Sequence, residues 1–176
     1  HTIKSEEIFV HRIRDLSLRK PILEKITFSK NEKVLDIGCN VGLLSHYLSE
    51  RGCKTTGYEM DEPIINSAKT ISNILNYKIN FRAFDLDIDL KNSKENFDTV
   101  FLFSVIHHTK NMTENCIILS KMCSRIIIEC RLFEKGRKPI IVDNKKKWIE
   151  TSNWHYKSLE DLYIGLEKLF PDFYFS

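Results

Sequence analysis

The feature that most constrains this chain is residues 33–45, KVLDIGCNVGLLS, which join an apolar run, a glycine turn and the beginning of a helix. The apolar residues within 34–37 suit a strand that is covered on both of its faces. Asp36 interrupts this run, and Gly38 and Gly42 follow it. Glycine lets the backbone approach a ligand closely, and a ligand there can meet N–H groups at the start of a helix. The stretch therefore predicts a ligand site at a strand–helix turn.

An acidic residue identifies the kind of ligand. Glu59 ends the next apolar stretch, about 20 residues further on, where a carboxylate can accept hydrogen bonds from ribose hydroxyls. A nicotinamide dinucleotide site requires the pattern G-x-G-x-x-G, whose middle glycine admits a pyrophosphate. Here Asn40 and Leu43 stand at the second and third glycine positions. The spacing therefore favours a nucleoside cofactor other than a nicotinamide dinucleotide.

The pattern Asp36-x-Gly38-x-Asn40-x-Gly42 resembles the first motif of the class I S-adenosylmethionine-dependent methyltransferases, D/E-x-G-x-G-x-G. Asn40 departs from the commonest form, but asparagine tolerates a left-handed backbone better than other non-glycine residues. The resemblance extends over residues 32–129. The alternative is a tight turn that binds no ligand.

Three further segments match the family in order. Asp85 corresponds to the acidic residue after the third strand, which contacts the adenine amino group in family members. Residues 97–100, FDTV, match the fourth strand, and residues 105–108, VIHH, match a segment often found at its end. The resemblance implies S-adenosylmethionine as donor and S-adenosylhomocysteine as product, and it leaves the acceptor open.

Alternating apolar patterns predict an α/β fold, a doubly wound, Rossmann-like and mostly parallel sheet with helices on both faces, in a single domain. The expected strands cover residues 34–37, 55–59, 77–84, 97–103 and 125–130. The expected helices cover residues 6–26, 43–52, 64–75, 111–122 and 159–169. Pro21 is expected to kink or split the first helix, and Asp61 to cap the third.

We expect residues 1–28 to form an N-terminal helical cap and residues 29–176 to form the S-adenosylmethionine-binding core. Both ends of the chain look cut. The sequence does not begin with Met, and only residues 173–175 could begin the sixth strand of the family's sheet. The sequence therefore predicts a domain of a longer protein, with a terminal strand or strands missing, and with an additional domain or partner subunit.

Composition favours a cytoplasmic protein. With 176 residues and 42% apolar content, the chain is long enough to bury a core. We expect no membrane span, because no apolar run reaches about 18 residues. The five cysteines include no C-x-x-C pair, which favours reduced thiols. No pattern of ligands predicts a metal site.

The resemblance assigns donor binding to residues on several segments. The expected cofactor-binding residues are Asp36, Gly38, Cys39, Asn40, Gly42, Glu59, Met60, Asp85, Leu86, Ser104 and Arg12.

Residues after the fourth and fifth strands are expected to face the acceptor, because the site of an open α/β sheet lies beyond the carboxyl ends of its strands. His107 and His108 are the candidate bases, with His108 preferred, since a neutral imidazole is poised near pH 7. The alternative is that the pair only shapes the loop beside the donor. Glu129 and Arg131 lie on one face of the extended chain and would either bind the acceptor or pair with each other.

A basic segment follows. Residues 131–147 contain seven Lys or Arg against two acidic residues. Arg137 within this segment, and Trp154 and Tyr156 after it, suit an anionic or carbohydrate-like acceptor, because cations hold phosphate and aromatic faces stack on rings. The alternative is a solvated loop whose aromatic residues close the core. The favoured function is methyl transfer to an O or N atom of a small acceptor. An RNA methyltransferase and a catalytically silent partner subunit are the competing hypotheses.

Overall fold

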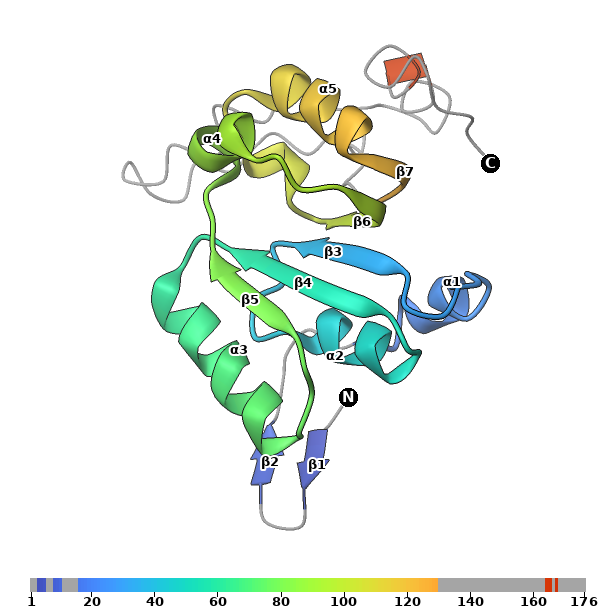
Figure 1. The fold of residues 1–176 in the computed structure, drawn as a ribbon, viewed down its shortest axis with the longest axis vertical. Coiled ribbons are helices and arrows are strands. Elements are labelled where there is room, and N and C mark those ends of the chain that lie inside the picture. The colour runs from blue at the N-terminus through green and yellow to red at the C-terminus, as the bar shows by residue number, and fades with distance from the viewer. Residues whose placement is uncertain (1–2, 6–7, 11–15, 130–163, 166, 168–176) are drawn as a thin grey trace, which may run out of the picture. The chain divides into compact units, whose positions relative to one another are not determined.

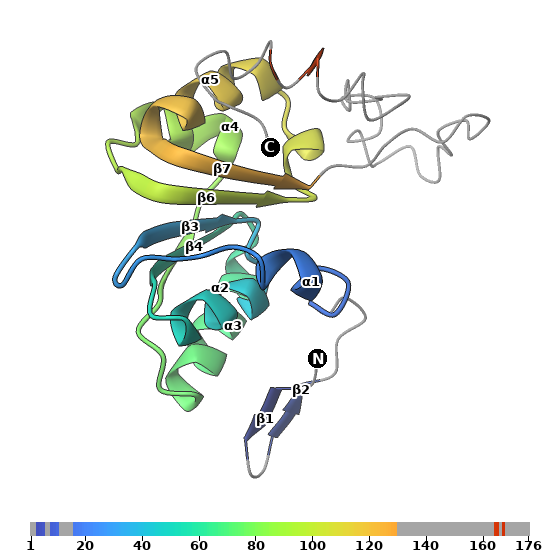
Figure 2. The same ribbon diagram turned by 90° about the vertical axis from the view of Figure 1, so that its right-hand side faces the viewer.

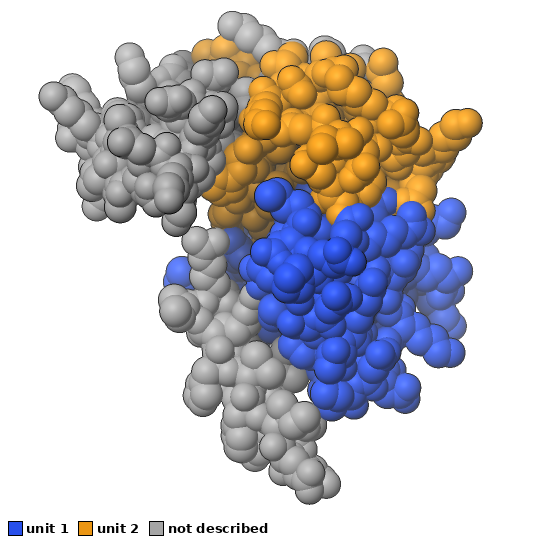
Figure 3. All heavy atoms as spheres, turned by 90° about the vertical axis from the view of Figure 1, so that its left-hand side faces the viewer, with its two compact units in different colours: residues 1–83 blue, residues 84–176 orange. Residues whose placement is uncertain are grey.

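The computed structural model describes residues 3–5, 8–10, 16–129, 164–165 and 167. The chain divides into two compact units, residues 1–83 and residues 84–176 (Figure 3). The elements of the first unit are β1 (Ile3–Ser5), β2 (Ile8–Val10), α1 (Lys20–Leu23), β3 (Lys33–Ile37), α2 (Leu43–Glu50), β4 (Lys54–Glu59), α3 (Glu62–Ile74) and β5 (Asn80–Ala83). Those of the second are α4 (Leu86–Asp89), the 3-10 helix η1 (Leu90–Asn92), β6 (Phe97–Phe103), the 3-10 helix η2 (Ile106–His108), α5 (Met112–Met122) and β7 (Cys123–Glu129).

The first unit contains three parallel strands in the order β5-β4-β3. Helix α2 contacts β3 and β4, and α3 contacts β4 and β5 (Figures 1 and 2). Val34 and Leu35 are fully buried although they point to opposite faces of β3, as expected for a strand covered on both sides. Asp61 caps α3 by accepting a hydrogen bond from the main-chain N–H of Ile64 (3.2 Å). The predicted cap is therefore confirmed.

The second unit contains the parallel pair β6 and β7, with α5 packed against β7 (Figure 2). The middle of β6, residues 100–102, is fully buried, as is Leu119 on α5. The short elements α4 and η1 come between β5 and β6 along the chain. They have no counterpart among the sequence-based predictions. Leu90 of η1 is fully buried, which fixes this connection to the core of its unit.

The five predicted strands and the helices that begin near residues 43, 62 and 112 are confirmed, with shifts of up to three residues at their ends. The helix predicted over residues 6–26 is wrong. Residues 3–5 and 8–10 form the antiparallel pair β1–β2, and among the described residues of this range only Lys20–Leu23 is helical. The apolar residues of β2 are β-branched or aromatic, which favours a strand. Pro21 lies in the first turn of α1, because proline starts a helix more readily than it continues one.

Other predictions concern residues that the structure does not describe. The helix over residues 159–169 lies outside the described part of the chain except at 164–165 and 167, and residues 173–175 lie outside it entirely. The division at residues 28 and 29 stays a prediction. Within the described residues, no helix is long and apolar enough to cross a membrane.

Candidate functional site

The glycine turn between β3 and α2 has three residues in the left-handed conformation. The φ angles of Gly38, Asn40 and Gly42 are 69°, 51° and 83°. The expectation that asparagine would tolerate this backbone is confirmed. The Asn40 side chain supports the turn locally, because its Oδ1 accepts a hydrogen bond from the next main-chain N–H (2.8 Å).

The main-chain N–H groups of residues 38–42 all donate within the protein. The first two donate to the Tyr58 carbonyl oxygen at 2.8 and 3.0 Å, and the third donates to the Glu59 carboxylate at 3.1 Å. The N–H of Val41 donates to the Asn40 side chain, and the N–H of Gly42 donates to the Cys39 carbonyl oxygen at 2.9 Å. These five N–H groups are therefore engaged within the protein, and the expectation that a ligand meets the N–H groups of the helix, which begins at Leu43, stays a prediction.

Glu59 is the residue that this turn positions. It ends β4 and is half-buried. Its Oε2 accepts from the N–H of Asn40 (3.1 Å), and its Oε1 accepts from the N–H of Asp61 (3.2 Å). Each carboxylate oxygen has a second lone pair, so both can still accept a hydroxyl proton. The carboxylate is thus held between the turn and the start of α3, as a binder of two neighbouring ribose hydroxyls requires.

Asp36 links the two elements that the glycine turn joins, β3 and α2. Its side chain is almost fully buried, and its Oδ2 accepts a hydrogen bond from the Ser45 hydroxyl at 2.6 Å. This bond ties β3 to the first turn of α2. Burial raises the pKa of the Asp36 carboxyl to about 7, while the bond from Ser45 and the charge of Arg19 oppose the shift. Asp36 therefore has a structural role in placing the turn.

Gly42 has a second reason to be glycine. A Cβ at this position would lie 2.5 Å from the Phe81 ring, and a Cβ on Gly57 would lie 2.6 Å from the same ring and 2.9 Å from the Cys39 sulfur. The Phe81 ring thus fills the space beside two glycines, and it packs with Cys39, Ile65 and Ala68 in one buried cluster. Sequence reasoning missed Phe81 and Gly57, because the pattern of the turn does not show what lies behind it.

In the second unit, Asp85 caps α4. Its Oδ1 accepts from the N–H of Asp87 (2.8 Å), and its own N–H donates to Asp89 Oδ2 (2.8 Å). Leu86 is buried, whereas Met60 at the end of β4 is 74% exposed. The assignments of these residues to the donor stay predictions.

The carboxyl ends of β6 and β7 are joined by a pair of hydrogen bonds. The N–H of Ser104 donates to the Glu129 carbonyl oxygen (2.9 Å), and its hydroxyl donates to Glu129 Oε1 (2.5 Å). Ser104 has a φ of 58°, a conformation that L residues rarely adopt. His107 and His108 follow in η2, and the side chain of His108 is exposed. The structure therefore brings Ser104 and Glu129 into contact, in agreement with their expected place at the strand ends.

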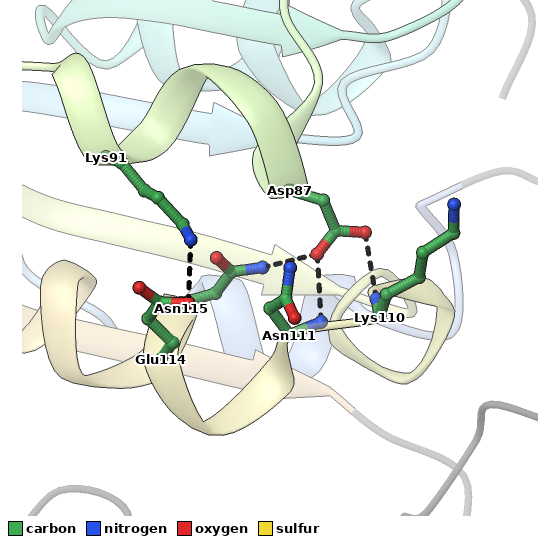
Figure 4. A network of polar contacts seen from close by, with 6 residues as sticks. All are labelled: Asp87, Lys91, Lys110, Asn111, Glu114 and Asn115. Carbon is green, nitrogen blue, oxygen red and sulfur yellow. Dashed lines mark hydrogen bonds and ion pairs between the residues drawn. The ribbon is translucent and has the colours of Figure 1, made fainter.

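Sequence reasoning also missed Asp87, which accepts three hydrogen bonds around the start of α5 (Figure 4). The only available signal was an acidic residue two positions after Asp85. Five predicted site residues lie outside the described residues: Arg12, Arg131, Arg137, Trp154 and Tyr156.

Comparisons with known proteins agree with this geometry. Residues 35–123 match a family model described as a methyltransferase domain. The chain is 34% identical over 115 residues to the ubiquinone biosynthesis O-methyltransferase of Coxiella burnetii (strain Dugway 5J108-111), a match that covers 64% of this chain and 48% of the relative. The chain thus spans about half the length of the curated relatives it matches.

Two solved structures show the fold. WbdD, crystallised with the kinase inhibitor LY294002, has a TM-score of 0.67 and 18% identity, covering 92% of this chain and 36% of WbdD. Coclaurine N-methyltransferase, bound to N-methylheliamine and S-adenosylhomocysteine, has a TM-score of 0.56 and 17% identity, covering 65% of this chain and 35% of that protein. The predicted Rossmann-like α/β fold is confirmed.

The family match covers half of the chain, so the chain belongs to the class I S-adenosylmethionine-dependent methyltransferases. The methyl donor of this family is S-adenosylmethionine. The carboxylate of Glu59 is held by the N–H groups of Asn40 and Asp61, and its assignment to the ribose of this donor stays a prediction.

Proposed function

We propose that this chain transfers a methyl group from S-adenosylmethionine to a hydroxyl oxygen of a small, anionic or carbohydrate-like acceptor. The observation that carries the proposal is the Glu59 carboxylate, held by two main-chain N–H groups at the end of β4. The relatives that are named O-methyltransferases support oxygen as the acceptor atom.

Residues around the glycine turn would hold the donor. Glu59 accepts the ribose hydroxyls, and the left-handed turn at Gly38, Asn40 and Gly42 keeps the backbone close to the methionine and ribose portion. Asp85 would bind the adenine amino group. When bound, the donor supplies an electrophilic methyl group on a sulfonium.

The protein's own contribution is orientation and proton removal. Holding an acceptor oxygen in line for attack can supply roughly 7–11 kcal/mol of the barrier. His108 is exposed and would take the proton of the acceptor hydroxyl, which adds about 10²–10⁴-fold to the rate. Glu129 at the end of β7 would accept a hydrogen bond from the acceptor. The other proposed acceptor contacts are Arg131, Arg137, Trp154 and Tyr156.

Donor binding is tested by calorimetry with S-adenosylhomocysteine. Glu59→Ala should weaken binding by one to a few powers of ten, since charge-assisted hydrogen bonds contribute roughly 1.5–3 kcal/mol each. Glu62→Ala, which removes an exposed carboxylate three residues further on, should bind as the parent does. A parent chain that does not bind S-adenosylhomocysteine would refute the proposal, and equal binding by Glu59→Ala would mean that the ribose is misplaced.

Methyl transfer is tested with methyl-labelled donor and three acceptors: a catechol, a sugar phosphate and a short single-stranded RNA. We expect label in a small acceptor, and a His108→Ala variant that turns over at least a hundredfold more slowly. Label in RNA alone would favour the competing RNA hypothesis. Unchanged turnover of His108→Ala would retire the proposed base.

A further inference from the structure

Residues 104–111 connect β6 to α5 and carry the histidine pair. This segment begins with the left-handed residue Ser104 and ends at Asn111, the residue that directly precedes α5. A non-glycine residue in this conformation costs of order 1–3 kcal/mol and persists only where its surroundings hold it. The contacts of the segment therefore show what holds it.

Glu129 holds the beginning of the segment. Its main-chain carbonyl oxygen accepts from the N–H of Ser104 (2.9 Å), and its carboxylate accepts from the hydroxyl of the same residue (2.5 Å). Both hydrogen bonds are donated by Ser104 and accepted by the last residue of the neighbouring strand β7.

Asp87 holds the end of the segment (Figure 4). Its Oδ2 accepts from the N–H of Lys110 (2.8 Å), and its Oδ1 accepts from the N–H of Asn111 and from the side-chain amide of Asn115, both at 3.0 Å. Asn115 is fully buried, so the loss of its partner would leave a buried donor unsatisfied. A carboxylate beside the N-terminus of α5 is also favoured by the helix dipole.

The middle of the segment is fixed by its own contacts. The N–H of His108 donates to the Val105 carbonyl oxygen (2.8 Å), and both the N–H and the hydroxyl of Thr109 donate to that of Ile106 (3.2 and 2.9 Å). Ile106 and Thr109 are buried, whereas His108 is exposed. The segment is therefore a short platform that presents His108 to solvent and is anchored at each end by an acidic residue.

We propose that Asp87 is a positioning residue, which keeps residues 104–111 in the arrangement that binds the donor. This proposal rests on the proposed function, because it takes Ser104 as one of the expected donor-binding residues. Asp87 acts at a distance in sequence, from α4: two of its hydrogen bonds fix the main chain of the segment, and the third binds the Asn115 side chain on α5. Where the competent arrangement is only partly populated, the apparent affinity equals the intrinsic affinity multiplied by the populated fraction.

The test compares three variants of the full chain. Asp87→Ala removes all three contacts, and Asp87→Asn keeps the shape and one acceptor oxygen. Glu114→Gln is the matched control, because Glu114 forms an exposed ion pair with Lys91 (3.0 Å) at the same junction. Amide hydrogen exchange is followed residue by residue, and S-adenosylhomocysteine affinity is measured by calorimetry.

Asp87→Ala should raise exchange at residues 108–111 at least tenfold and leave the middle of β6 and β7 unchanged. It should weaken S-adenosylhomocysteine binding about tenfold, as expected if the competent arrangement falls to a tenth of the population. Asp87→Asn should show smaller changes in both exchange and affinity than Asp87→Ala does. Glu114→Gln should change neither the exchange rates nor the affinity by more than twofold.

Three results would overturn the proposal. Faster exchange across the whole second unit would show that Asp87 only stabilises the fold. Faster local exchange with unchanged affinity would show that the segment does not serve the donor. A parent chain that fails to bind S-adenosylhomocysteine would refute the proposed function itself, and the positioning role with it.

Discussion

Asp36 illustrates how a buried carboxyl places the glycine turn between β3 and α2. Its hydrogen bond from Ser45 joins β3 to α2, and burial raises its pKa from 3.8 to about 7. Between these values the unfolded chain is ionised while the folded chain retains the proton. The contribution of Asp36 to the free energy of unfolding should therefore fall as pH rises from about 4 to about 7, by roughly 4 kcal/mol at about 1.4 kcal/mol per pKa unit.

Asp36→Asn tests this expectation, because its amide oxygen can still accept from Ser45 but carries no titrating proton. In urea unfolding between pH 4 and pH 7.5, the parent should lose stability relative to this variant as pH rises. Glu62→Gln, which removes an exposed carboxyl, should follow the parent. Parallel stability curves for Asp36→Asn and the parent would show that Asp36 titrates as it does in the unfolded chain.

At the scale of the element, the sequence predicts β3, β6 and β7 because strands covered on both faces are mostly apolar, even where one polar residue such as Asp36 stands among them. The glycine turn is predictable from Gly38 and Gly42, because a left-handed backbone favours glycine, whereas the assignment of Glu59 to a ribose stays a prediction. The helix predicted over residues 6–26 is wrong because scattered apolar positions alone do not define a helix, and Pro21 marks a helix start. Asp87 could not be found, because its partners lie 23 to 28 residues away and depend on the packing of α4 beside α5.

The packing of the first sheet also depends on a pair that no local pattern shows. Gly57 on β4 lies opposite Phe81 on β5, and the Phe81 ring occupies the space of the missing side chain. Gly57→Ala should cost about 1–3 kcal/mol of unfolding free energy, as overpacking does. Adding Phe81→Leu should recover part of this loss, and the double-mutant cycle in urea should give a coupling of at least about 0.5 kcal/mol. Strictly additive effects would mean that the ring and the glycine do not compete for space.

At the scale of the whole molecule, the division of the chain at residues 83 and 84 does not coincide with a family boundary. The methyltransferase family match runs over residues 35–123 and so includes strands of both units. A family fold that requires strands from both units should unfold as one cooperative domain. The two compact units are therefore expected to be parts of one domain.

Thermal unfolding with and without S-adenosylhomocysteine tests this. A ligand at one hundred times its dissociation constant adds about 2.7 kcal/mol to the free energy of unfolding. For a chain of this size, that should raise the midpoint temperature by roughly 5–11 °C. Amide hydrogen exchange, measured by mass spectrometry, should slow by the same factor on ligand binding in peptides from β4–β5 and from β6–β7. A cooperative domain transmits the stabilisation to every strand. A shift confined to peptides of one unit, or two separate transitions, would show that the units unfold independently and that the donor stabilises only one of them.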